Sequence, residues 1–253
     1  MRIFDSHAHY DDPAFDPDRE ELLAKLPEHG VALVLNAGTT VATSLTSLAL
    51  AEKYHYIYAA VGLHPEEVEN ILPGDLDRIE RLARSKKCVA IGEIGLDYHY
   101  EGFDRQKQLE VFEAQLKLAR KLDMPVVIHD RDAHGDTMQL VTAYRPRGVL
   151  HCFSGSAETA AQAVALGLYI GFTGSVTFKN NRKAPAVLGA IPRDRILLET
   201  DCPYMAPVPD RGRRCDSTMI SYTAARIGEI IGLSADDVCE LGYLNASRLY
   251  GIG

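Results

Sequence analysis

Short runs of apolar, mostly β-branched residues alternate along the chain with longer segments in which apolar residues recur every three or four positions. Runs such as Val31–Leu35 and Val126–Ile128 are apolar throughout, as is typical of parallel strands buried on both faces. The pattern predicts these strands: Ile3–His7, Val31–Asn36, Ile57–Gly62, Cys88–Gly92, Pro125–His129, Gly148–Cys152, Leu168–Phe172 and Arg195–Thr200.

The segments between these strands have helical periodicity, clearest in Asp104–Leu122, whose apolar residues fall on one face. Weaker helical patterns cover Asp18–Lys25, Val41–Lys53, Leu76–Ser85, Ala133–Tyr144, Glu158–Leu166 and Ala184–Ala190. Thr218–Leu249 predicts two further helices, the second beginning near Ser234. Strand and helix alternation repeated about eight times favours an α/β fold of the (β/α)8 TIM-barrel type, with extra C-terminal helices, over an open doubly wound sheet.

The amino-acid composition limits the classes of protein to which this chain can belong. The 253 residues are 46% hydrophobic and 25% charged, an ordinary globular balance that fits one barrel domain over residues 1–253. No signal-peptide pattern or membrane-length apolar run is present. The five cysteines are scattered without a CxxC pair, which is typical of a reducing compartment. We therefore expect a cytoplasmic protein that has no membrane contact.

The formal net charge of −8 argues against a protein that coats nucleic acid through a broad basic surface. An enzyme that binds phosphate groups only at a metal site remains compatible with this charge. Nothing in the sequence indicates an obligate protein partner, and we expect a monomer.

Ionisable residues gather where the predicted strands end. They are His7, His9, Glu93, His129, His151 and Asp201, all at carboxyl ends. In a barrel these ends converge on one mouth, where active sites are built. Singly, each residue could cap a turn, form an ion pair or lie in the core. Together, at one predicted face, they favour a functional site.

The residue types at this face suit metal binding. His7 and His9 are two residues apart, so on an extended segment their imidazoles point to the same side. Four imidazoles and two carboxylates would hold two divalent cations, with Glu93 as the bridging ligand. His29 and His55 fall at the opposite end of the predicted barrel, and we expect them to be structural.

Several motifs extend this pattern over nearly the whole chain: Phe4-Asp5-Ser6-His7-Ala8-His9, Val61-Gly62-Leu63-His64-Pro65, Gly92-Glu93-Ile94-Gly95-Leu96-Asp97-Tyr98, Pro125–Arg131, His151-Cys152-Phe153-Ser154-Gly155 and Leu198–Pro203. In this order they resemble the TatD family of metal-dependent deoxyribonucleases. The resemblance implies a TIM-barrel hydrolase in which His7, His9, Glu93, His129, His151 and Asp201 bind metal. It also implies 3′-to-5′ exonuclease action on single-stranded DNA, usually with Mg²⁺, and places His64, Arg131 and the Ser154-Gly155 turn near the substrate phosphate.

The expected mechanism is hydrolysis by water activated between two metal ions, with Asp201 as general base and Glu93 between the metals. Arg131 would pair with the phosphate, and Lys179 and Arg211 would follow the adjacent backbone of the substrate. Ligand chemistry favours Zn²⁺ or another transition ion for tight binding, with Mg²⁺ or Mn²⁺ in turnover.

Two other functions stay open at this point. The same activated water could attack a carbonyl group, as in an ester or amide hydrolase such as an aminoacyl-tRNA deacylase. A non-catalytic metal or nucleic-acid binding module is disfavoured, because binding alone gives no reason to gather ligands from several strands. The sequence also departs from the family pattern after the eighth strand, where Cys215-Asp216-Ser217 replaces the usual Asn-x-Pro. We expect that departure to alter the pocket rim and substrate preference.

Overall fold

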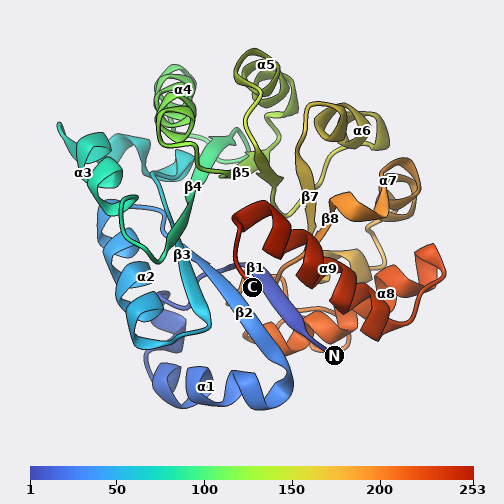
Figure 1. Ribbon diagram of the computed structural model, residues 1–253. Coiled ribbons are helices and arrows are strands. Elements are labelled where there is room, and N and C mark those ends of the chain that lie inside the picture. The colour runs from blue at the N-terminus through green and yellow to red at the C-terminus, as the bar shows by residue number, and fades with distance from the viewer.

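Eight parallel strands in sequential order, β1 to β8, form the centre of the computed structural model, which describes residues 1–253 (Figure 1). The strands are β1 (Ile3–Ala8), β2 (Val31–Ala37), β3 (Ile57–Val61), β4 (Cys88–Asp97), β5 (Val126–Arg131), β6 (Gly148–Leu150), β7 (Tyr169–Phe172) and β8 (Ile196–Leu198). The ring closes just beyond β8, where the His9 amide donates to the Cys202 carbonyl and the Asp201 amide donates to the His7 carbonyl, both at 2.9 Å. The predicted TIM barrel is confirmed.

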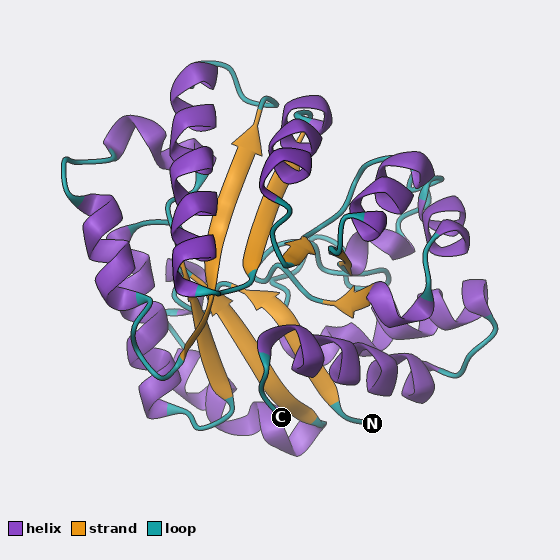
Figure 2. Cartoon of the chain, turned by 45° about the horizontal axis from the view of Figure 1, so that its top comes forward, coloured by secondary structure: helices purple, strands orange, loops and turns teal.

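Helices cover the outside of this ring, as Figure 2 shows. They are α1 (Arg19–Lys25), α2 (Val41–Lys53), α3 (Asp75–Leu82), α4 (Arg105–Leu122), α5 (His134–Tyr144), α6 (Ala157–Ala165), α7 (Ala184–Ala190), α8 (Ile220–Ile231) and α9 (Ala235–Tyr250). Each predicted helix is present within a few residues of its expected bounds, and Ser234 caps α9 by accepting from the Asp237 amide at 3.1 Å. None of the helices combines the length and the hydrophobicity needed to cross a lipid bilayer.

Two groups of buried apolar side chains make up the core. The larger group fills the space between the strands and the surrounding helices. The smaller group takes side chains from all eight strands, including Phe4, Val127 and Leu197, and joins them to Leu249 and Tyr250 at the end of α9. Because alternate strand residues point inward, this smaller group fills the barrel interior. The last turn of α9 therefore closes the barrel at the amino-terminal ends of the strands.

The strand pairing is irregular at two places that carry predicted site residues. The β1–β2 register shifts between Asp5 and Ala8, and the β4–β5 register shifts between Ile91 and Ile94. Such irregularities re-aim the side chains beside them. His7 and Glu93 lie inside the two shifted stretches, so their side chains can turn to the mouth of the barrel.

Strand bounds differ from the sequence prediction mostly at this mouth. Two predicted strands are too short: β4 continues to Asp97 and β5 to Arg131, so Glu93 lies within a strand and His129 is not the last residue of one. Two others are too long, because β6 stops at Leu150, one residue before His151, and β8 stops at Leu198. Backbone pairing between strands, which sets these ends, continues through the polar residues of β4 and β5.

Candidate metal centre

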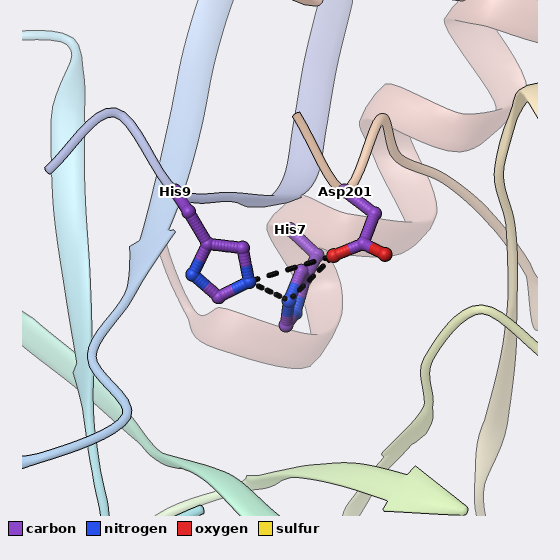
Figure 3. A group of neighbouring side chains, drawn as sticks. All are labelled: His7, His9 and Asp201. Atoms are coloured by element: carbon purple, nitrogen blue, oxygen red, sulfur yellow. Dashed lines mark hydrogen bonds and ion pairs between the residues drawn. The ribbon is translucent and has the colours of Figure 1, made fainter. Parts of the chain in front are cut away.

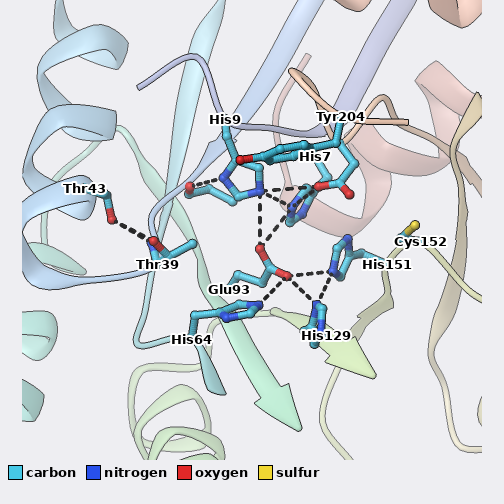
Figure 4. A network of polar contacts seen from close by, with 12 residues as sticks. His7, His9, Thr39, Thr43, His64, Glu93, His129, His151, Cys152 and Tyr204 are labelled. Atoms are coloured by element: carbon cyan, nitrogen blue, oxygen red, sulfur yellow. Dashed lines mark hydrogen bonds and ion pairs between the residues drawn. The ribbon is translucent and has the colours of Figure 1, made fainter. Parts of the chain in front are cut away.

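Glu93 lies at the centre of the polar cluster that fills the mouth of the barrel (Figure 4). Its carboxylate is only 3% exposed, and each of its two oxygens faces a different set of imidazoles. Oε2 lies 3.2 Å from His7 Nε2 and 3.4 Å from His9 Nε2. Oε1 lies 2.7 Å from His151 Nε2 and 2.9 Å from His129 Nδ1. One carboxylate thus joins two groups of nitrogen donors.

Asp201 completes the first of these groups. Its Oδ1 is 3.5 Å from His7 Nε2 and 3.4 Å from His9 Nε2, and those two nitrogens are themselves 3.0 Å apart (Figure 3). The Asp201 backbone has a φ of 58°, in the left-handed region that aspartate tolerates better than most residues. This conformation occurs in the segment directly after β8, which pairs with the end of β1.

The second group also includes a histidine that was not among the predicted metal ligands. His64 Nε2 lies 3.2 Å from Glu93 Oε1, so His64 faces the same oxygen as His129 and His151. The resemblance to a known family had placed His64 beside the substrate phosphate. In the structure it caps the short helix Pro65–Asn70 through Nδ1, which accepts from the Glu66 amide at 3.2 Å, and Nε2 is left to face the cluster.

Partners behind the imidazoles fix the orientation of several rings. His9 Nδ1 contacts the Ala37 carbonyl at 2.9 Å, and His129 Nε2 contacts Asp97 Oδ2 at 2.9 Å. Such partners select the tautomer and raise the basicity of the nitrogen that faces a metal. The buried Glu199 carboxylate binds the Cys152 amide and lies 3.8 Å from His151 Nδ1. Asp97, Glu199 and the Ala37 carbonyl were not among the predicted site residues.

Glycine makes the close approach of β4 and β5 possible. Gly95 has a φ of 145°, and a Cβ atom built on it would lie 1.9 Å from the His129 carbonyl oxygen. Any other residue would push β4 away from β5 and would change the distance between Glu93 and His129. The sequence signal for this packing is the spacing of Gly92 and Gly95 around Glu93.

Burial and neighbouring charges set the pKa values of the side chains in the cluster. Burial by itself raises the pKa of Glu93, but the surrounding imidazoles, His151 first, outweigh burial and hold the pKa well below its usual value. Burial lowers the pKa of His129, yet Asp97 and Glu93 raise it to about 10. Burial and the neighbouring His151 together lower the pKa of His7 to about 4. These shifts favour an ionised Glu93 beside a protonated His129.

The donor set fits divalent metal ions. Two sets of three side chains that include Glu93 are close enough together to bind one ion each. They are His7, Glu93 and His151, and His64, Glu93 and His129. His7, His9 and Asp201 form another such group. Ring nitrogens and carboxylate oxygens converge on each other at 2.7–3.5 Å, which is the arrangement of ligands around common cations. Neutral imidazoles and ionised carboxylates are the states that bind metal.

The cationic residues predicted to contact substrate lie on the rim and not in the cluster. Arg131 packs on the Tyr100 ring, 4.9 Å from its centroid, and Arg211 packs on the Phe178 ring at 4.4 Å. Lys179 is exposed next to Phe178. Ser154 is exposed, and its carbonyl accepts from Lys183 Nζ at 3.0 Å. None of these predicted residues forms a hydrogen bond or ion pair with Glu93 or its imidazoles.

The segment that departs from the family pattern is largely buried, with Cys215 and Ser217 buried and Asp216 half-buried. Ser217 is fully buried, and its hydroxyl contacts Asp5 Oδ2 and the Tyr10 hydroxyl, both at 2.7 Å. Asp216 caps the short helix Ser217–Met219 by accepting from the Thr218 amide at 2.9 Å. Cys215 is buried beside them. These residues connect the loop after β8 to β1.

A TIM barrel whose strand ends bring imidazoles and carboxylates together at one mouth defines a metal-dependent hydrolase. The sequence profile of the TatD related DNase family matches residues 4–251, and the chain belongs to this family of hydrolases that act on ester bonds. The metal-dependent hydrolase YabD of Bacillus subtilis is 37% identical over 253 residues, covering 99% of both chains.

Other relatives have more specific names or solved structures. The 3′-5′ ssDNA/RNA exonuclease TatD of Erwinia tasmaniensis is 31% identical over 259 residues, which cover 99% of this chain and 100% of that protein. The crystal structure of YjjV, a TatD homologue from Escherichia coli, superposes with a TM-score of 0.94 at 32% identity. That comparison covers 100% of this chain and 99% of YjjV.

Proposed function

We propose that this protein is a deoxyribonuclease that removes nucleotides from the 3′ end of single-stranded DNA with the help of two divalent cations. The observation that carries the proposal is the division of the contacts of Glu93, whose Oε2 faces His7 and His9 while Oε1 faces His64, His129 and His151. A single carboxylate between two nitrogen-rich donor groups suits a pair of ions bridged by that carboxylate. The names of the exonuclease relatives supply the polarity and the substrate class.

In this proposal His7, His9 and Asp201 would hold one cation, His129 and His151 would hold the other, and Glu93 would be shared. His64, which lies 3.2 Å from Glu93 Oε1, would face the substrate phosphate beside the second cation. When bound, such cations polarise the substrate phosphate and acidify water. The imidazole-rich donor set favours Zn²⁺ or a similar ion for tight binding, while Mg²⁺ or Mn²⁺ supports turnover.

The chain's own residues would then position the phosphate and move the proton. Asp201 presents Oδ1 to His7 and His9, and its second oxygen points away from these rings (Figure 3), free to accept the proton of the attacking water. On the rim, Arg131, Lys179 and Arg211 would contact the phosphates of neighbouring nucleotides. Attraction of the substrate would be local, because the protein as a whole is acidic.

The test is cleavage of one single-stranded oligonucleotide labelled at its 3′ end or at its 5′ end, with Mg²⁺, Mn²⁺ or Zn²⁺. We expect the 3′ label to be released first as a mononucleotide and the 5′-labelled strand to shorten stepwise. Glu93→Ala should lower the rate by about 10²–10³-fold or more, the usual loss for one preorganised electrostatic group. Glu110→Ala, an exposed carboxylate on α4, is the matched control.

Two results would contradict the proposal. Release of the 5′ label first would reverse the polarity. No cleavage of DNA or of the equivalent RNA strand, in protein shown to hold metal, would favour carbonyl hydrolysis, and a panel of ester and amide substrates would then identify the reaction.

A further inference from the structure

A cleft of about 350 Å³ lies at the other end of the barrel from the metal centre, and arginine dominates its lining. Arg145 and Arg147 come from the loop between α5 and β6, Arg195 precedes β8, and Arg248 lies near the end of α9. These positions are at the amino-terminal ends of the strands or beside them. The cleft is therefore separated from the carboxyl-end mouth by the length of the barrel.

No carboxylate lines this cleft, although acidic residues outnumber basic ones, 35 to 27, in the whole chain. Several arginines elsewhere on the surface pair with a carboxylate, among them Arg78 with Asp75, Arg84 with Glu80 and Arg226 with Glu229, at 2.7–3.0 Å. Two of the cleft arginines instead contact a backbone carbonyl or an aromatic ring. Arg147 donates to the Asp123 carbonyl at 3.1 Å, and Arg195 lies 4.9 Å from the centroid of the buried Tyr169 ring.

The uncharged part of the lining is mostly apolar and consists of Pro146, Leu166, Gly167, Tyr169 and Leu249. Leu249 and Tyr169 are buried, so Pro146 and Leu166 supply most of the exposed apolar surface. An adjoining hollow of about 460 Å³ shares Arg145, Pro146 and Arg147 and adds one further arginine, Arg120, and one carboxylate, Asp123. The cleft thus offers several guanidinium groups beside an apolar surface, and its volume falls within the range usual for small-molecule sites.

We propose that this cleft binds a nucleoside polyphosphate. Guanidinium groups bind phosphate oxygens in bidentate fashion, and several together match the multiple charge of a phosphate chain. The apolar residues would cover the base or the ribose, which a simple inorganic anion lacks. An occupant of this charge would also relieve the mutual repulsion of arginines that have no carboxylate partner. The site is independent of the proposed nuclease activity.

The test is calorimetric titration of ATP into the wild-type protein and into Glu93→Ala, which removes the central carboxylate of the metal centre. We expect one saturable site in both, which separates this cleft from phosphate binding at the mouth. Arg248→Ala and Arg145→Asn should each weaken ATP binding by about tenfold, the effect of one lost charge-assisted contact. Asparagine is chosen at position 145 because its φ is 44°, where asparagine is tolerated.

Arg226→Ala on α8 is the matched control and should change the ATP affinity by less than about twofold. Oligonucleotide cleavage by Arg248→Ala and Arg145→Asn should equal that of wild type, so that loss of ATP binding is distinct from loss of the active site. The proposal is overturned if wild type shows no saturable binding, or if the cleft variants bind ATP as wild type does. If inorganic pyrophosphate binds as tightly as ATP, the cleft does not recognise the nucleoside, which contradicts the proposal. If a single-stranded oligonucleotide displaces ATP, the cleft is a nucleic-acid site and the proposal is wrong.

Discussion

At the scale of single residues, several side chains of the metal centre stay charged although burial disfavours their charged forms. Glu93, His129 and Asp97 stay ionised at the barrel mouth because each faces groups of opposite charge at about 3 Å. The sequence placed Glu93 and His129 near strand ends, but it did not identify Asp97 as a site residue. It placed His64 near the substrate phosphate and gave no distance between His64 and Glu93.

Asp201 should matter more for turnover than for holding the cluster together. We expect Asp201→Asn to lower kcat by about 10²–10⁴-fold at saturating metal, because the amide keeps an oxygen toward His7 and His9 but accepts protons poorly. Steady-state cleavage and metal content, measured on the same preparations, check this. Asp132→Asn, an exposed residue in the loop after β5, is the control. Full turnover by Asp201→Asn would show that another group accepts the proton.

Ser217 should contribute to stability through its buried contacts. Ser217→Ala removes the hydroxyl that lies 2.7 Å from both Asp5 Oδ2 and the Tyr10 hydroxyl, leaving two buried polar groups with one partner fewer. We expect a loss of about 1–3 kcal/mol in the free energy of unfolding by urea. Ser221→Ala, a half-buried serine on α8, should cost less. An equal loss at both positions would mean that the Ser217 network adds no stability.

At the scale of elements, the periodicity of apolar residues located every strand and helix but not the irregular pairing that serves the site. Regular alternation along β1 and β4 would not carry both the interior apolar residues and the site residues to the inside. The register shifts at Asp5–Ala8 and Ile91–Ile94 solve this conflict. They depend on pairing between strands, which single-strand patterns do not contain.

The join between β5 and α5 should give a measurable pH dependence of stability. His134, at the start of α5, contacts Asp130 Oδ2 through Nδ1 at 2.6 Å, and this hydrogen bond raises the pKa of His134 above its ordinary value. The folded state therefore binds the proton more tightly than the unfolded state. That stabilisation is fully present below about pH 6.5, the unfolded pKa, and is lost as pH rises through the folded pKa.

We accordingly expect His134→Ala to destabilise the protein more at pH 6 than at pH 9, measured by urea unfolding at both values. Comparing His134→Ala with wild type at the same pH cancels the contribution of other titrating groups to the free energy of unfolding. In an Asp130→Asn background the difference between the two pH values should largely disappear, because the charged partner is absent. A destabilisation that is the same at both pH values would exclude this ion pair as its cause.

At the scale of the whole molecule, the metal centre links strands from around the barrel. Its residues come from β1, β4, β5 and the segments after β1, β3, β6 and β8. Ions bound there would stabilise the folded state, since the unfolded chain cannot gather these ligands. Removal of metal should therefore affect the stability of the barrel as well as catalysis.

We expect Zn²⁺ or Mn²⁺ at about 100 times its dissociation constant to add about 2.7 kcal/mol of stability for each site, and a chelator to abolish that gain. Thermal unfolding of wild type and Glu93→Ala, with and without metal, measures it. The gain should shrink in wild type as pH falls, because protons compete for the imidazoles. Unchanged unfolding temperatures in wild type with metal and with chelator would contradict metal binding at this cluster.

The sequence by itself determined the order of strands and helices, the barrel class, and the residue types that reach the mouth, because periodicity and strand ends are local properties of the chain. The tertiary structure alone decided which oxygen of Glu93 faces which imidazole, that His64 joins the cluster, and that arginines from three separate segments line one cleft. Each of these findings concerns distances between residues that are far apart in the chain. They depend on packing and register, which no local pattern encodes.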